Sequence, residues 1–160
     1  TIGNFEWADS LELLRNISLQ MKKGDVLLLG MDLIKPEAVL HVAYNDPRGI
    51  TAAFNKNILN SVNDLIKSDF QTSDFDHLAF FNKEKSRIEM HLVANKEVSV
   101  RSPHFIEDLQ LKEGEAIHTE NSHKYSTRHI QEIVEVSGLK LNQTHTDERG
   151  WFSLTEFQKG

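Results

Sequence analysis

The apolar run Val26-Leu27-Leu28-Leu29 is the strongest indication of fold class in this 160-residue chain. Four consecutive apolar residues are typical of a short strand buried on both faces, as in a parallel sheet. Such a strand needs a neighbour on each side, whereas the other strands that the sequence indicates are antiparallel. We therefore expect an α/β protein in which part of the sheet is missing or is supplied by another chain.

Helical periodicity surrounds this run. Residues 7–21 carry apolar side chains at helical spacing, and the segment 22–24 (KKG) ends that helix with two cations and a C-cap glycine. After the strand, residues 36–44 begin with Pro and Glu, a helix-start signal, and residues 58–66 place apolar residues on one helical face. A last helix is expected around residues 130–138, which end in Ser-Gly.

The middle and the end of the chain predict antiparallel strands. Residues 77–81 indicate one strand, and residues 87–92 (RIEMHL) alternate strictly between polar and apolar side chains. Val98 and Val100 continue this alternation, which is typical of a sheet with one solvated face. Residues 139–157 predict a terminal hairpin with its turn at DERG.

Composition excludes several classes of function. The net charge is −6 and there is no run of basic residues, so we expect no nucleic-acid partner. No apolar stretch reaches the ~20 residues that cross a bilayer, and no signal peptide is visible. The absence of cysteine agrees with a reducing compartment, and we expect a cytoplasmic protein. Because the chain opens with TIGNF and no methionine, we expect a truncated fragment.

Two short segments carry candidate binding residues. Tyr44 precedes the turn residues 45–49 (NDPRG), so its phenol could point from a helix end into a cleft, although the segment could equally be a plain loop. If residues 119–125 (TENSHKY) are extended, Glu120 and Ser122 point the same way. A carboxylate beside a hydroxyl can receive an imidazole or an ammonium group. The alternative for this pair is a solvated strand end or a helix cap.

The eight histidines do not predict a metal site by their spacing. His118 and His123 are five residues apart, and no pair has the i, i+4 spacing with an adjacent glutamate that marks a helical zinc site. We therefore predict no bound metal. The sequence also contains no Walker loop and no GxGxxG segment.

Several segments share their order and spacing with one enzyme family. The segments are residues 1–4 (TIGN), 30–35 (GMDLIK), 43–46 (AYND), 49–55 (GITAAFN), 87–92 (RIEMHL), 114–115 (GE) and 119–125 (TENSHKY). Together they resemble the histidine-specific S-adenosylmethionine-dependent methyltransferases, the family of the ergothioneine-pathway enzyme that trimethylates histidine. The resemblance extends from Thr1 to Phe157.

The resemblance implies a fold and a cofactor. It implies the C-terminal half of a class I, Rossmann-like methyltransferase sheet, with residues 1–35 and 126–160 in the core. Residues 36–125 would form an inserted α+β substrate-binding subdomain. The implied cofactor is S-adenosylmethionine, and Thr1 and Gly3 would form the tail of its site. The glycine-rich cofactor loop and the acidic ribose ligand of the family lie upstream of Thr1, so we expect the chain alone to be inactive.

The resemblance also implies the substrate-binding residues. Asn4 would hold the substrate α-amino group, and Tyr44 would contact the backbone groups of the amino acid. Phe54 and Met90 would form the pocket wall. No residue is indicated as the catalytic base.

The substrate would be read by a further pair, Glu120 and Ser122, which resemble the residues that contact the imidazole edge. The implied activity is N-methylation of the α-amino group of histidine or a related amino acid, because relatives act on other amino acids, including a prenylated tryptophan. Two alternatives stay open. One is a non-catalytic assembly module that pairs with another chain, or with itself, through an open sheet edge. The other is a metal hydrolase that uses the histidines.

Overall fold

The computed structural model describes residues 2–160 and divides them into two compact units. Unit 1 extends to Pro36 and also contains Asn82–Arg87 and Asn121–Gly160, and unit 2 contains Glu37–Phe81 and Ile88–Glu120. Both units combine helices with sheet, so the predicted mixed α/β class is confirmed. Within residues 2–160, no helix is both long and apolar enough to cross a membrane.

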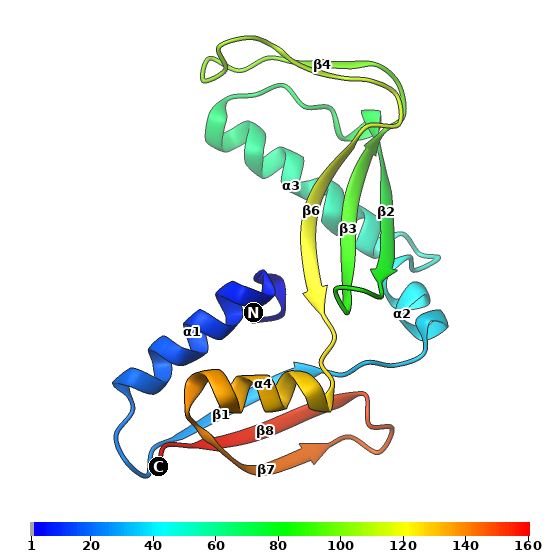
Figure 1. Ribbon diagram of the computed structural model, residues 1–160. Helices are drawn as coiled ribbons and strands as arrows, with labels where there is room; N and C mark the ends of the chain where they lie inside the picture. The colour runs from blue at the N-terminus through cyan, green and yellow to red at the C-terminus, as the bar shows by residue number, and fades with distance from the viewer. Residues whose placement is uncertain (1) are drawn as a thin grey trace. The chain divides into compact units, whose positions relative to one another are not determined.

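Unit 1 is built on a three-stranded sheet with the order β1-β8-β7 (Figure 1). Its elements are η1 (Ile2–Asn4), α1 (Trp7–Gln20), β1 (Val26–Asp32), α4 (Thr127–Ser137), β7 (Lys140–Thr146) and β8 (Phe152–Gln158). Strand β8 is antiparallel to both of its neighbours. The two predicted helices and the terminal hairpin of this unit are therefore confirmed.

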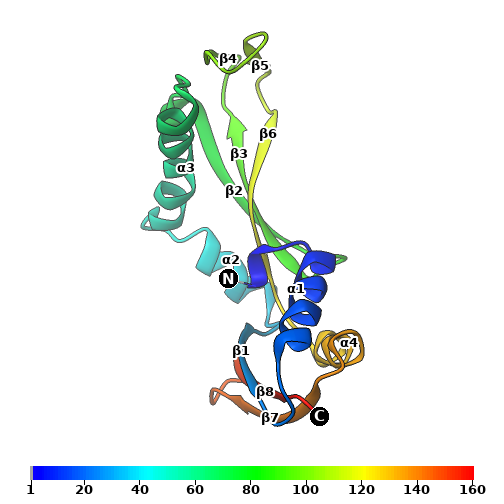
Figure 2. The same ribbon diagram turned by 90° about the vertical axis from the view of Figure 1, so that its left-hand side faces the viewer.

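Helices α1 and α4 cover one face of this sheet (Figures 1 and 2). Leu14 of α1 and Ile133 of α4 are fully buried and meet Met31 of β1 and Phe157 of β8 in one apolar cluster. The helical period of the sequence thus places one apolar stripe of each helix on the sheet.

The second face of the sheet overturns the expectation that β1 is buried on both sides. Val26 and Leu28 are 47% and 57% exposed, and Phe152 of β8 is 48% exposed on the same side. The apolar run is therefore covered on one face only, since no described element packs on the other. Gly30 lies under the Phe152 ring, because a Cβ atom added to it would come within 2.9 Å of Phe152 Cζ.

Strand β1 also has an open edge within the described part of the chain. It pairs antiparallel with β8 along Val26–Asp32, and its other side has one parallel bridge, from Leu33 to Tyr125. The Tyr125 backbone N–H donates to Asp32 O at 2.8 Å, and the Ile34 N–H donates to Tyr125 O at 3.0 Å. The rest of this edge offers unpaired strand backbone.

Unit 2 places helices on a second sheet with the order β2-β3-β6, whose arrows alternate in direction (Figure 1). Its elements are α2 (Glu37–Tyr44), α3 (Ile50–Ile66), η2 (Thr72–Asp74), β2 (Phe75–Asn82), β3 (Arg87–Ala94), β4 (Val98–Val100), β5 (Leu109–Leu111) and β6 (Ala116–His123). The ends of β2, β3 and β6 carry residues assigned to unit 1. The predicted antiparallel strands are confirmed, and residues 116–123 are extended.

The strict alternation in β3 separates the two faces of this sheet. Ile88 and Met90 pack with Leu40 of α2, and Leu92 packs with Leu59 of α3. Helix α3 lies along one side of the sheet (Figure 2). The side chains of Glu89 and His91, at the alternate positions of β3, leave the opposite face.

Candidate functional site

A hollow of about 220 Å³ lies in unit 2 between helix α3 and the edge strand β6. It is lined by Phe54, Asn55, Asn57, Ile58, Ser61, Thr119 and Glu120. Two of the predicted substrate residues, Phe54 and Glu120, are thus brought together although they are far apart in sequence. The Phe54 ring is 66% exposed, so it stands at the rim as an apolar wall. The volume is below the ~300–1,000 Å³ of sites for drug-sized ligands, which suits a single small molecule.

Asn55 fixes the helix wall of this hollow to the sheet. Its side chain is buried, and its Nδ2 donates to His91 O at 3.0 Å and to His77 Nδ1 at 3.0 Å. Thr119 Oγ1 lies 2.6 Å from Asn55 Oδ1 and 3.0 Å from Met90 O. One buried amide therefore connects α3 to all three strands and holds Phe54, its neighbour in sequence, at the hollow.

His77 extends this network to the end of helix α2. Because Asn55 Nδ2 is a donor, His77 Nδ1 accepts, and the N–H at Nε2 donates to Tyr44 O at 2.8 Å. Tyr44 itself packs at the margin of the cluster that contains Met90, which is 4% exposed. Sequence reasoning named Tyr44 and Met90 as candidates, but it did not name Asn55 and His77, which position the elements that carry them.

The turn after Tyr44 is held by side-chain bonds. Asp46 accepts from the backbone N–H groups of Ile50 at 3.0 Å and Thr51 at 2.8 Å, and these bonds lower its pKa to about 2. Asn45 Nδ2 donates to Ala79 O at 3.0 Å. Gly49 has φ +69°, a conformation that favours glycine. The segment thus begins helix α3 and positions it against β2, so residues 45–49 have the structural role of a turn.

In unit 1, Ser122 belongs to a buried charge network. Lys124, whose side chain is fully buried, donates from Nζ to Ser122 Oγ at 2.7 Å and pairs with Asp32 Oδ2 at 3.0 Å. Lys35 also pairs with Asp32. Since Ser122 Oγ accepts from an ammonium group, its own O–H is polarised to act as a donor. Asn4, the other predicted substrate residue of this unit, is exposed in η1.

The residues predicted for the cofactor are only partly described. Thr1 lies outside the described residues. A Cβ atom on Gly3 would lie 3.7 Å from the backbone N and O of His123, an ordinary contact distance, so this side of Gly3 already packs against His123. Burial raises the pKa of the Tyr125 phenol to about 12, which makes it a poor general base.

A second hollow, of about 400 Å³, lies in unit 1, and its lining among residues 2–160 includes none of the predicted site residues. Arg87 Nη1 contacts both carboxylate oxygens of Glu6, at 2.8 and 2.7 Å, and the hydrogen bond from Arg87 lowers the pKa of Glu6. His123, which is 4% exposed, also lines this hollow, and burial lowers its pKa. Three carboxylates (Glu6, Glu84 and Glu132) and three cations (Lys85, Arg87 and Arg128) line it, so the hollow has no single charge preference.

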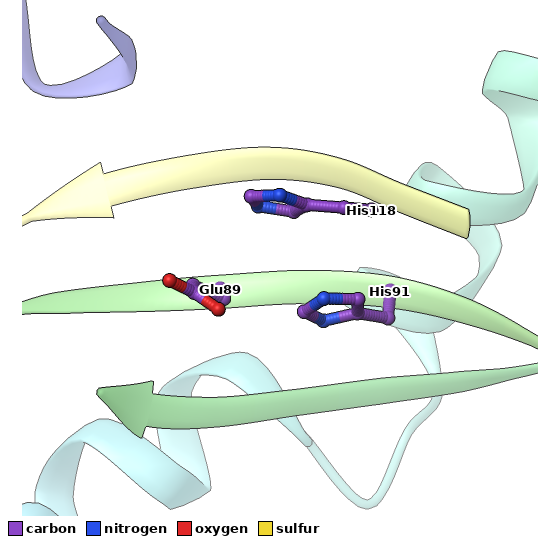
Figure 3. Close-up of side chains that lie close together, drawn as sticks. All are labelled: Glu89, His91 and His118. Atoms are coloured by element: carbon purple, nitrogen blue, oxygen red, sulfur yellow. The ribbon is translucent and has the colours of Figure 1, made fainter. Parts of the chain in front are cut away.

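One set of side chains in unit 2 could hold a metal ion: Glu89, His91 and His118. Their ligand atoms all lie within 4.8 Å of one another (Figure 3). Burial, followed by the charge of His118, lowers the pKa of His91. Residue spacing did not indicate this set, because its members meet across two strands and not along one helix.

The family profile described as histidine-specific methyltransferase, SAM-dependent, matches residues 1–159. The chain belongs to this family. It is 38% identical over 157 residues to histidine N-alpha-methyltransferase of Mycolicibacterium smegmatis and 37% identical over 155 residues to that of Mycobacterium tuberculosis. Each alignment covers 97% of this chain and 48% of the relative.

A more distant relative carries another substrate in its name. The L-tryptophan methyltransferase trpM of Psilocybe serbica is 28% identical over 160 residues, with 96% of this chain and 43% of the relative covered. The chain thus spans about half the length of the curated relatives it matches. The family match over residues 1–159 establishes membership of the family, but not the activity of the whole protein.

Proposed function

We propose that this chain forms the substrate-binding part of an S-adenosylmethionine-dependent N-methyltransferase that acts on the α-amino group of histidine or a related amino acid. Residues 36–125 would be the inserted substrate-binding subdomain, and residues 1–35 and 126–160 would belong to the methyltransferase core. The observation that carries the proposal is the hollow that pairs Phe54 with Glu120, in a chain of the histidine-specific family.

The imidazole would be read by one acceptor and one donor. Glu120 and Ser122 lie two residues apart on β6, a spacing that directs side chains to the same face of a strand. The Glu120 carboxylate accepts the N–H of a neutral imidazole, and Ser122, which accepts from Lys124, donates to the other ring nitrogen. An indole has an N–H but no second ring nitrogen, so it offers the Ser122 hydroxyl no acceptor. The pair therefore favours histidine over tryptophan.

The remaining proposed residues would align the reacting amine. The cofactor, when bound, supplies the methyl group on a sulfonium. Asn4 would hold the α-amino nitrogen, Tyr44 the backbone groups of the amino acid, and Phe54 and Met90 the apolar sides of the ring. Gly3, with Thr1, would face the cofactor. Alignment of this kind contributes much of the rate in a displacement that needs little other protein chemistry.

Calorimetric titration of the product of the full reading frame with histidine and with S-adenosylhomocysteine tests this proposal. We expect both to bind, and we expect Glu120→Ala to weaken histidine by roughly 10–100-fold, since an unpaired buried donor costs about 1–3 kcal/mol. Binding of S-adenosylhomocysteine should be unchanged in this variant. The matched control is Glu113→Ala, which removes an exposed carboxylate from a turn of the same unit.

Three results would change the proposal. If Glu120→Ala and Glu113→Ala bind histidine as tightly as the unmodified protein, Glu120 does not read the substrate. If S-adenosylhomocysteine binds and histidine does not, the activity moves to another amino acid, and tryptophan is the first to titrate. If neither ligand binds, the catalytic proposal fails.

A second candidate function is assembly through the open edge of β1. Its support is that β1 has one full strand partner among the described residues and exposes Val26 and Leu28 on its uncovered face. A second copy of the chain could extend the sheet along this edge. The expected result is a mass by light scattering that rises with concentration and falls to the monomer in Leu28→Lys. A monomer at every concentration would exclude this candidate.

A further inference from the structure

The open face of the unit 2 sheet carries a row of three stacked rings. Phe80 of β2, His91 of β3 and His118 of β6 lie on adjacent strands, with centroids 5.4 Å apart for the first pair and 4.7 Å for the second. The planes are within 11° and 17° of parallel. This row fixes the His91 imidazole between two neighbours and brings His118 beside it.

Glu89 completes a set of potential ligands beside the row, next to His91 along β3. It precedes His91 by two residues on β3, so both side chains leave the same face of the sheet (Figure 3). Glu89 is 8% exposed, and its carboxylate oxygen and the two imidazole nitrogens lie within 4.8 Å of one another. Two imidazoles and a carboxylate suit Zn²⁺ and similar divalent transition ions.

A buried nitrogen of His91, Nδ1, has no hydrogen-bond partner among the described residues, which agrees with a missing partner for this ring. Buried polar atoms in proteins are nearly always paired, with a protein group, with water or with an ion. The stacked neighbours, Phe80 and His118, cannot supply a donor through their ring faces.

We propose that Glu89, His91 and His118 form a binding site for a divalent transition-metal ion such as Zn²⁺, which fastens the edge strand β6 to β3. Tetrahedral bonds of about 2.0–2.1 Å require ligand atoms about 3.4 Å apart, so atoms that lie up to 4.8 Å apart must approach one another when the ion binds. His118 is exposed on an edge strand and can tilt its ring toward the ion without displacing a core residue. Three protein ligands leave a fourth position for water.

Titration of the chelator-treated chain with Zn²⁺ tests the site. We expect one equivalent of Zn²⁺ to bind, and we expect His118→Asn to weaken this binding by at least roughly tenfold, because one of three ligands is lost. The control His104→Asn removes another exposed histidine of the same unit and should leave the affinity unchanged. Because His118 is exposed, loss of binding in its variant does not depend on misfolding.

Spectroscopy and thermal unfolding separate this site from scattered binding to other histidines. Co²⁺ at the site should give visible absorption that His118→Asn abolishes, and Zn²⁺ should raise the melting temperature of the unmodified chain and of His104→Asn only. Equal Zn²⁺ affinity in the two variants, or no binding to the unmodified chain, would overturn the proposal. Zn²⁺ binding should persist in Glu120→Ala, so failure of the metal site and failure of the histidine pocket are distinguishable.

Discussion

The two units accommodate their buried polar groups in different ways. In unit 2, Asn55, His77 and Thr119 exchange hydrogen bonds between neutral groups. In unit 1, the fully buried side chain of Lys124 is compensated by Asp32. A neutral network costs little once each member is bonded, whereas a buried charge is tolerated only while its counter-charge is present. Removal of one interaction partner should therefore lower the free energy of unfolding more in unit 1 than in unit 2.

The largest effect is expected for Asp32→Asn. This change removes the carboxylate that pairs with the buried Lys124 ammonium, and we expect the free energy of unfolding to fall by about 3 kcal/mol. Urea unfolding followed by tryptophan fluorescence measures it, because Trp7 and Trp151 both belong to unit 1. The control Lys96→Ala removes a side chain that is 60% exposed from its pair with Asp74 and should cost less than about 1 kcal/mol. Equal losses in the two variants would mean that burial of Lys124 does not set the cost.

A smaller effect is expected for Asn55→Ala in unit 2. The change leaves His77 Nδ1, the His91 carbonyl and the Thr119 hydroxyl without one partner each, and the free energy of unfolding should fall by about 2 kcal/mol. Circular dichroism during urea unfolding measures the loss, since unit 2 has no tryptophan. Asn60→Ala, on the exposed side of the same helix, should be neutral or slightly stabilising. An Asn55→Ala variant as stable as Asn60→Ala would show that the network contributes nothing to stability.

The sequence predicted the helices and strands better than it predicted which of their faces are buried. Helices α1 and α4 follow from apolar periodicity, and β3 follows from strict alternation, because these patterns arise within one element. The prediction that β1 is buried on both faces was wrong. An apolar run such as residues 26–29 is typical of a strand that is covered on both faces, but the described residues cover only one face of β1.

Candidate site residues that belong to a local sequence motif could be named from the sequence. Residues whose role depends on contacts between distant segments could not. Phe54 and Glu120 were expected from the family resemblance, and they line one hollow. The role of Asn55 could not be foreseen, because its partners lie 22 to 64 residues away. The same holds for His118, which meets His91 only through the pairing of β3 with β6.

The smallest effect is expected from the cap of helix α4. His129 Nδ1 accepts from the Ser126 backbone N–H at 3.0 Å, and burial lowers the pKa of His129 below the ordinary 6.5. The unfolded chain therefore takes up a proton at this residue below about pH 6.5, while the folded chain resists it, so the stability contributed by the cap is present above pH 6.5 and is lost as the pH falls.

Replacement of His129 by glutamine separates the cap from its titration. Glutamine at this position can reach back to the Ser126 N–H and does not titrate, so His129→Gln should lose less stability than the unmodified chain between pH 7 and pH 5. Fluorescence-detected urea unfolding at both pH values measures the difference, and His145→Gln, on an exposed strand, should keep the unmodified profile. Burial also lowers the pKa of His123, so some acid sensitivity should survive in His129→Gln. Identical pH profiles for His129→Gln and His145→Gln would show that acid sensitivity in unit 1 arises from His123 and the ion pairs, and not from the helix cap.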